Sequence, residues 1–69
     1  MKDFEKQLFI QEYKDLITHY NELRWFIFVA QNCDYVSDDQ LELMYTQLNT
    51  MQEYIDILNR RAYFEEIEI

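Results

Sequence analysis

The sequence has no glycine and no proline, and it has a single cysteine among 69 residues. Without glycine, the chain cannot form the Gly-rich loops that cradle phosphates, nor the EF-hand loop, which requires glycine at its turn. The lone Cys33 excludes a disulfide framework and fits a reducing compartment. No histidine lies near Cys33 in the sequence, so we do not expect it to act as a nucleophile.

Long hydrophobic runs are also missing. The longest, Trp25 to Ala30, is six residues, whereas a helix that crosses a bilayer needs roughly 20. The first residues, Met1 to Lys6, lack the apolar core of a signal peptide. We therefore expect a cytoplasmic protein that does not bind a membrane.

Basic residues are few. Six Lys and Arg stand against 14 Asp and Glu, a net charge of −8. Residues 1–31 hold five acids and four bases, and residues 32–69 hold nine acids and two bases. Direct binding to duplex nucleic acid is therefore not expected, because it requires a basic face that displaces phosphate counterions.

Two apolar stripes with helical spacing dominate what is present. Their members recur at alternating intervals of three and four residues, which places each set on one side of a long helix. The first stripe is Phe9, Tyr13, Leu16, Tyr20, Leu23, Ile27 and Ala30, and the second is Leu41, Met44, Leu48, Met51, Ile55, Leu58 and Ala62.

The segment between the stripes, residues 32–37, is the stretch that is richest in turn-forming residues. Ser37 begins a Ser-x-x-Gln capping box, in which its hydroxyl accepts from the amide of Gln40. These signals predict an all-α fold: helices over about 2–31 and 38–65 form one antiparallel hairpin domain, residues 1–69.

Apolar residues outside the stripes predict an interface. They are concentrated at the two ends of the hairpin, and monomers rarely expose large apolar patches. We expect a homodimer that forms a four-helix bundle, or a higher oligomer, with a host protein as a further partner. The tail and the turn could instead fold back onto a monomer. Phe4 and Leu8 would then be covered by Tyr63, Phe64, Ile67 and Ile69, and Trp25 or Phe28 by Tyr35 and Val36. The interface candidates are Phe4, Leu8, Trp25, Phe28, Val29, Tyr35, Tyr63 and Phe64.

Catalytic residues are not recognisable. His19 is the sole histidine, so no histidine pair is available for a metal, and we expect no metal, no cofactor and no enzymatic activity. A nucleotide could still bind between aromatic and arginine side chains, since bases stack on aromatic rings and phosphates pair with guanidinium groups. For that alternative the candidates are Arg24, Tyr54 and Arg61.

The second helix carries a pattern that resembles a known group of proteins. Gln47-Leu48-x-x-Met51-x-x-Tyr54-Ile55-x-x-Leu58-x-x-Arg61-Ala62, followed by Glu65-x-Ile67-Glu68-Ile69, is similar to short phage proteins of unknown function related to a crAss-like phage reading frame. Glu12-Tyr13-x-x-Leu16, Leu23 and Phe26-Ile27 fit the same group. Two features depart from its pattern: residues 34–37 contain no proline, and Glu66 stands where glycine is expected.

The resemblance implies a phage or prophage accessory protein, located in the cytoplasm of the host bacterium. Small acidic phage proteins often antagonise host defences. The leading hypothesis is therefore a non-enzymatic inhibitor of a host defence factor that acts by protein–protein interaction. The alternatives are an oligomeric sponge that sequesters a nucleotide immune signal, and a structural phage component.

Overall fold

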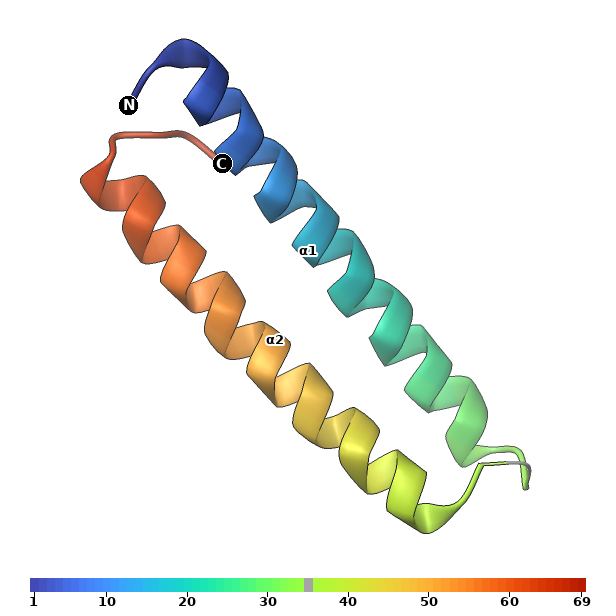
Figure 1. Ribbon diagram of the computed structural model, residues 1–69. Helices are drawn as coiled ribbons and strands as arrows, with labels where there is room; N and C mark the ends of the chain where they lie inside the picture. The colour runs from blue at the N-terminus through green and yellow to red at the C-terminus, as the bar shows by residue number, and fades with distance from the viewer. Residues whose placement is uncertain (35) are drawn as a thin grey trace.

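A computed structural model describes residues 1–34 and 36–69, which form two antiparallel helices (Figure 1). Helix α1 spans Asp3–Gln31 and helix α2 spans Asp38–Phe64. The helices pack side by side with both termini at one end, and the described residues include no strand. The predicted all-α hairpin is confirmed, and the predicted helix ends agree within one residue.

The start of α2 follows the predicted cap. The amide of Gln40 donates to Ser37 Oγ at 3.3 Å, so one of the free amides of the first turn is satisfied. Asp38 and Asp39 place negative charge at the positive end of the helix dipole. Helix α1 begins more weakly, because its N-cap residue Lys2 makes no side-chain cap hydrogen bond.

The end of α2 is a Schellman motif. The amide of Ile67 donates to the carbonyl of Ala62 at 2.8 Å, and the amide of Glu66 donates to the carbonyl of Tyr63 at 3.3 Å. Glu66 adopts φ 56°, the left-handed conformation that glycine accepts most readily. The chain then turns back toward α1, and Ile67 packs against the core (Figure 1). The tail is therefore neither a further turn of helix nor a free strand.

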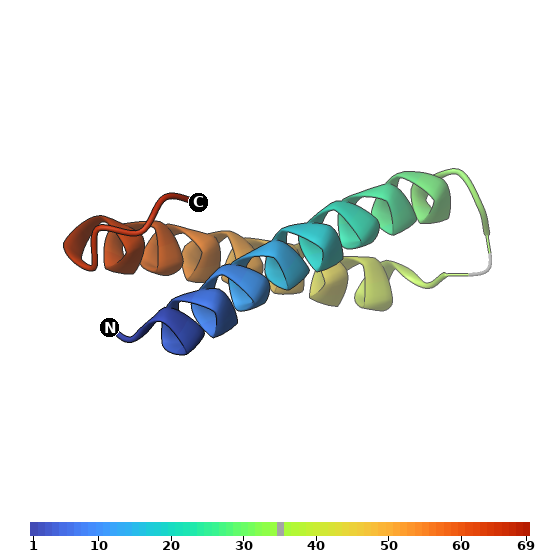
Figure 2. The same ribbon diagram turned by 90° about the horizontal axis from the view of Figure 1, so that it is seen from above.

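The core lies along the two predicted stripes, but it is uneven. Its main cluster sits toward the end of the hairpin that holds the termini: Phe9, Leu16, Ile55, Leu58 and Ala62. Near the turn, Ile27 and Ala30 of α1 are buried, whereas Leu41, Met44 and Leu48 of α2 are half-buried. The helices cross when seen from above (Figure 2). The two helices therefore cover each other's apolar stripe only in part. Among the residues that the structure describes, seven hydrophobic side chains are buried.

Candidate functional site

The outer side of α1 carries an aromatic pair that the core does not use. Trp25 and Phe28 are three residues apart, so they are neighbours on the helix surface. Their rings stack with centroids 5.7 Å apart and planes 24° apart. Both stay exposed, at 67% and 59% of their surface. A flat ligand could extend this stack, because more than half of the surface of each side chain is exposed.

A shallow cavity of about 340 Å³ adjoins this pair. It is lined by Asn21, Arg24, Trp25 and Phe28, and we call these four residues the aromatic–arginine site. Its size is at the small end of the range of ligand pockets, roughly 300–1,000 Å³. Arg24 is supported from its own helix, because its Cζ lies 5.8 Å from the centroid of the Tyr20 ring.

The aromatic–arginine site lies on the basic side of a strongly acidic chain. Helical spacing of three and four residues places Lys6, Lys14 and Arg24 on the same side of α1 as Asn21 and Phe28. The carboxylates of α1 that follow Lys6, namely Glu12, Asp15 and Glu22, fall on other sides of the helix. Lys14 and Lys6 lie roughly 15 and 27 Å from Arg24 along the helix, beyond the roughly 8 Å at which salt screens exposed charges. Arg24 is therefore the base of α1 that an anion bound in this cavity would meet.

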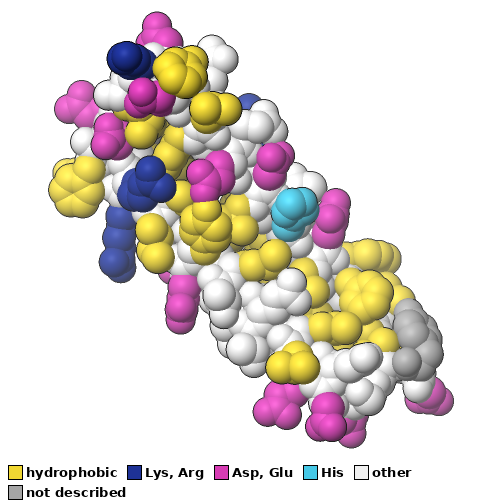
Figure 3. Space-filling model, viewed as in Figure 1, with side chains coloured by type: hydrophobic (Ala, Val, Ile, Leu, Met, Phe, Trp, Pro, Cys, Tyr) yellow, Lys and Arg dark blue, Asp and Glu magenta, His cyan; other side chains and the backbone are white. Residues whose placement is uncertain are grey.

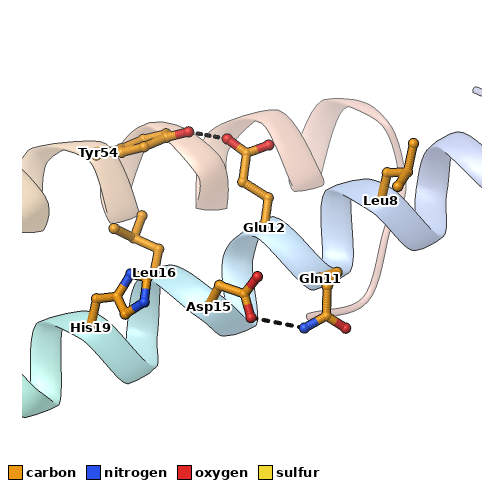
Figure 4. Close-up of a pocket in the computed structure, with 7 residues that line it drawn as sticks. All are labelled: Leu8, Gln11, Glu12, Asp15, Leu16, His19 and Tyr54. Atoms are coloured by element: carbon orange, nitrogen blue, oxygen red, sulfur yellow. Dashed lines mark hydrogen bonds between the residues drawn. The ribbon is translucent and has the colours of Figure 1, made fainter.

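A second cavity, of about 450 Å³, lies along the groove between the helices (Figure 4). Tyr54 of α2 donates a hydrogen bond to the Glu12 carboxylate of α1, and Gln11 donates to Asp15 at 2.9 Å. The hydrogen bond to Glu12, together with desolvation and the charge of Glu12, raises the pKa of Tyr54, while Arg61 opposes the shift. The lining is Leu8, Gln11, Glu12, Asp15, Leu16, His19 and Tyr54. With two carboxylates in the lining, this cavity disfavours a phosphate.

The three residues expected for a nucleotide are not brought into one site. Tyr54 and Arg61 are seven residues apart, two turns along the same side of α2. Arg61 lies over the Phe9 ring, with its Cζ 5.0 Å from the centroid. Arg24 belongs to the other cavity, together with Trp25. Within one chain, Arg24 therefore lies beside Trp25 and Phe28, which the sequence indicated as interface candidates.

The interface candidates remain exposed, with two exceptions. Val29 is half-buried, and Tyr35 lies outside the described residues. Phe4, Leu8, Tyr63 and Phe64 are all exposed at the end that holds the termini, where Tyr63 and Phe64 meet edge to face at 5.5 Å. The suggestion that the C-terminal residues cover Phe4 and Leu8 is wrong, because Phe4 and Leu8 stay 62% and 64% exposed. The Schellman turn instead directs Ile67 against the core.

Asn21 was missed as a functional candidate. Its residue type alone gives no functional signal. The spacing of Asn21, Arg24 and Phe28 by three and four residues is the signal that could have found it.

Within residues 1–34 and 36–69, no group of three or more His, Cys, Asp and Glu residues is placed to hold a metal ion. Neither helix among those described is long and apolar enough to cross a bilayer.

Comparison with known proteins identifies a family to which the chain is similar. The family model described as Sequestin matches residues 4–64, which include nearly all of α1 and the whole of α2. No curated protein and no solved structure is similar enough to match.

Proposed function

The chain belongs to the Sequestin family, and on this premise we propose that it is a non-enzymatic binding protein that sequesters a nucleotide-type ligand. The family's name indicates sequestration, and the aromatic–arginine site supplies chemistry that a nucleotide would use. Such a protein acts by mass action, because each bound ligand is removed from the free pool.

The observation that carries the proposal is the exposed Trp25–Phe28 stack beside Arg24. A nucleobase stacks on an exposed aromatic face, which contributes about 1–3 kcal/mol per base. The guanidinium of Arg24 can form paired hydrogen bonds with a phosphate. Asn21 offers an amide that can donate to and accept from the edge of a base or a ribose hydroxyl.

The resemblance to short phage proteins suggests the context. A phage protein that holds a host nucleotide signal would keep it from the host's immune effectors. This is the sponge hypothesis that the sequence left as an alternative, and the position of Arg24 beside Trp25 is the reason to favour it over the inhibition of a host protein.

The test begins with protein purified from bacteria. Heat denaturation should release an ultraviolet-absorbing small molecule, or the ligand-free protein should melt at a higher temperature when AMP, ATP or cyclic di-AMP is added. A nucleotide at 100 times its dissociation constant should stabilise the fold by about 2.7 kcal/mol. If nothing is released and none of these probes shifts the melting curve, the nucleotide assignment is wrong.

Matched variants locate the site. Trp25→Ala should weaken nucleotide binding by about 5- to 150-fold, the equivalent of one lost stack. Arg24→Gln should weaken the binding of ATP more than that of adenosine, because adenosine has no phosphate. As controls, Tyr63→Ala removes an exposed ring from α2 and Arg60→Gln removes an exposed arginine. Both variants should leave nucleotide binding unchanged.

Capture of a host protein remains a second candidate, because a separate exposed cluster exists. Phe4, Leu8, Tyr63 and Phe64 lie at the end of the hairpin that holds the termini, away from the aromatic–arginine site. Exposed aromatic residues often dominate protein interfaces. Affinity capture from host cells, with wild type beside a Tyr63→Ser and Phe64→Ser double variant, tests this candidate: a host protein retained by wild type and lost by the variant supports it.

A further inference from the structure

The arginine of the aromatic–arginine site lies over a ring that is not itself part of the cavity. Arg24 Cζ is 5.8 Å from the centroid of the Tyr20 ring, within the roughly 6 Å over which a cation and an aromatic face attract each other. The cavity is lined by Arg24 and its neighbours, and Tyr20 is not among the lining residues. The route from Tyr20 to a ligand in this cavity therefore runs through Arg24.

Tyr20 joins the site to the core. Its side chain is half-buried and packs against the main core cluster. Tyr20, Arg24 and Phe28 follow one another at intervals of four residues, so they form one row along the surface of α1. The row runs from a ring that the packing of the fold holds in place, across the guanidinium, to a ring of the exposed stack. Tyr20 thus gives the flexible side chain of Arg24 a fixed surface to lie on.

The position of Arg24 matters because the half of the molecule near the turn has few bases. Between Lys14 and Arg60, Arg24 is the sole Lys or Arg of the sequence. On the side seen in Figure 3, basic side chains gather toward the end that holds the termini, whereas acidic side chains also surround the turn. A phosphate bound near the turn therefore depends on one cation, and an arginine drawn toward these carboxylates would not meet it.

We propose that Tyr20 is a positioning residue: it holds the Arg24 guanidinium at the cavity and so sets the preference of the site for phosphorylated ligands. The inference rests on the proposed function, since it assigns a role in binding the phosphate of a nucleotide. A guanidinium that stacks on a ring engages it with its flat face, and the N–H donors in its plane stay available for a phosphate. Holding the side chain in place before the ligand arrives also reduces the conformational freedom that is lost on binding.

A second pair of the same kind supplies the control. Arg61 Cζ lies 5.0 Å from the centroid of the Phe9 ring, but Phe9 is buried in the core cluster. Neither residue lines the cavity beside Trp25. Arg61 therefore covers the core, whereas Arg24 adjoins a cavity that a ligand can enter. Arg61→Gln removes an equal charge and the same kind of contact, and it should leave the preference for phosphate unchanged.

Calorimetric titration of the ligand-free protein with ATP and with adenosine tests the role of Tyr20. Tyr20→Leu removes the ring and keeps an apolar side chain against the core. This variant should bind ATP about 2- to 5-fold more weakly, the equivalent of one exposed contact between a cation and a ring, and it should bind adenosine as wild type does. Tyr20→Phe keeps the ring and should retain the wild-type ratio of the two affinities.

Two further measurements separate positioning from a general loss of structure. Circular dichroism checks that each variant is folded, and Tyr20→Met replaces Tyr20→Leu if the latter unfolds. In an Arg24→Gln background, removal of the Tyr20 ring should no longer change the affinity for ATP, because the residue through which it acts is gone. A purely structural role would weaken both ligands and would persist without Arg24.

The outcomes distinguish this inference from the function on which it rests. If wild type binds ATP better than adenosine and loss of the Tyr20 ring leaves the ratio of affinities unchanged, the role of Tyr20 is wrong and nucleotide binding stands. An Arg61→Gln variant that loses the preference as strongly as Tyr20→Leu would overturn the role in the same way. Wild type that binds ATP no better than adenosine also overturns it, and the proposed function falls as well if AMP and cyclic di-AMP fail to bind.

Discussion

Replacing Leu58 with alanine should show how far this fold depends on a single contact cluster. Leu58 has 0% of its surface exposed and lies within the main core cluster, together with Phe9, Leu16 and Ile55. Leu→Ala changes at such positions destabilise proteins by about 2–5 kcal/mol, from lost burial and the cavity left behind. At about 0.05–0.15 kcal/mol per residue, a chain of 69 residues should be stable by only about 3–10 kcal/mol. The substitution should therefore remove a large part of the total stability.

The neighbouring Ile57 supplies the control. It is 52% exposed, so Ile57→Ala removes a similar side chain from the surface. Such a change should shift stability by only about 0.5 kcal/mol, partly offset by the better helix propensity of alanine. Urea unfolding followed by circular dichroism measures both variants. Equal losses from the two changes, or a loss below about 1 kcal/mol for Leu58→Ala, would refute the assigned core.

Three further changes test the caps and the pair across the groove. Ser37→Ala removes the oxygen that accepts from Gln40 and should lower the unfolding free energy by about 1 kcal/mol in urea titrations. Glu66→Gly should raise the melting temperature, because glycine adopts the φ of 56° at this position without strain. The raised pKa of Tyr54 means that its contact with Glu12 stabilises the fold fully below pH 10.0, and that this contribution is lost as pH rises through the raised value. As the pH rises above 10.0, Tyr54→Phe should therefore lose less stability than wild type in the same titration, and an equal loss would contradict this account.

The helices and their boundaries could be predicted because each rests on local signals. The spacing of three and four residues defines both stripes, and Ser37 marks the start of α2 by its own hydrogen bond. The absence of glycine and proline removes the usual reasons for a break within either helix. The hairpin then follows from the short connection.

The tail and the depth of the core could not be predicted in the same way. Glu66 in a left-handed conformation is unfavourable locally, and it is stable only because Ile67 gains a place against the core. The half-burial of Leu41 and Leu48 depends on how the helices cross, which the spacing does not specify. Both features result from tertiary packing that overrides local preference.

Residue type alone does not show which of the candidate ligand-binding residues lie together. Arg24 and Arg61 appeared equivalent in the sequence, yet Arg24 shares a cavity with Trp25, and Arg61 lies over Phe9 in the core region. The two arginines differ in their angular position around the helix relative to the apolar stripe, which we call the helical phase. This position can be read from the sequence once the stripes are known. The phase of each side chain relative to its stripe is therefore more informative here than its chemical type.

The exposed rings of α1 call for an explanation other than folding. Trp25 and Phe28 lie on the outer side of α1, where they are 67% and 59% exposed. Burying them elsewhere in the fold would stabilise it, so their exposure is better explained by binding than by folding. Trp25→Ala should therefore change the free energy of unfolding by no more than about 0.5 kcal/mol, while it weakens nucleotide binding. A larger loss of stability in urea titrations would show that Trp25 belongs to the packing of the fold and not to a binding site.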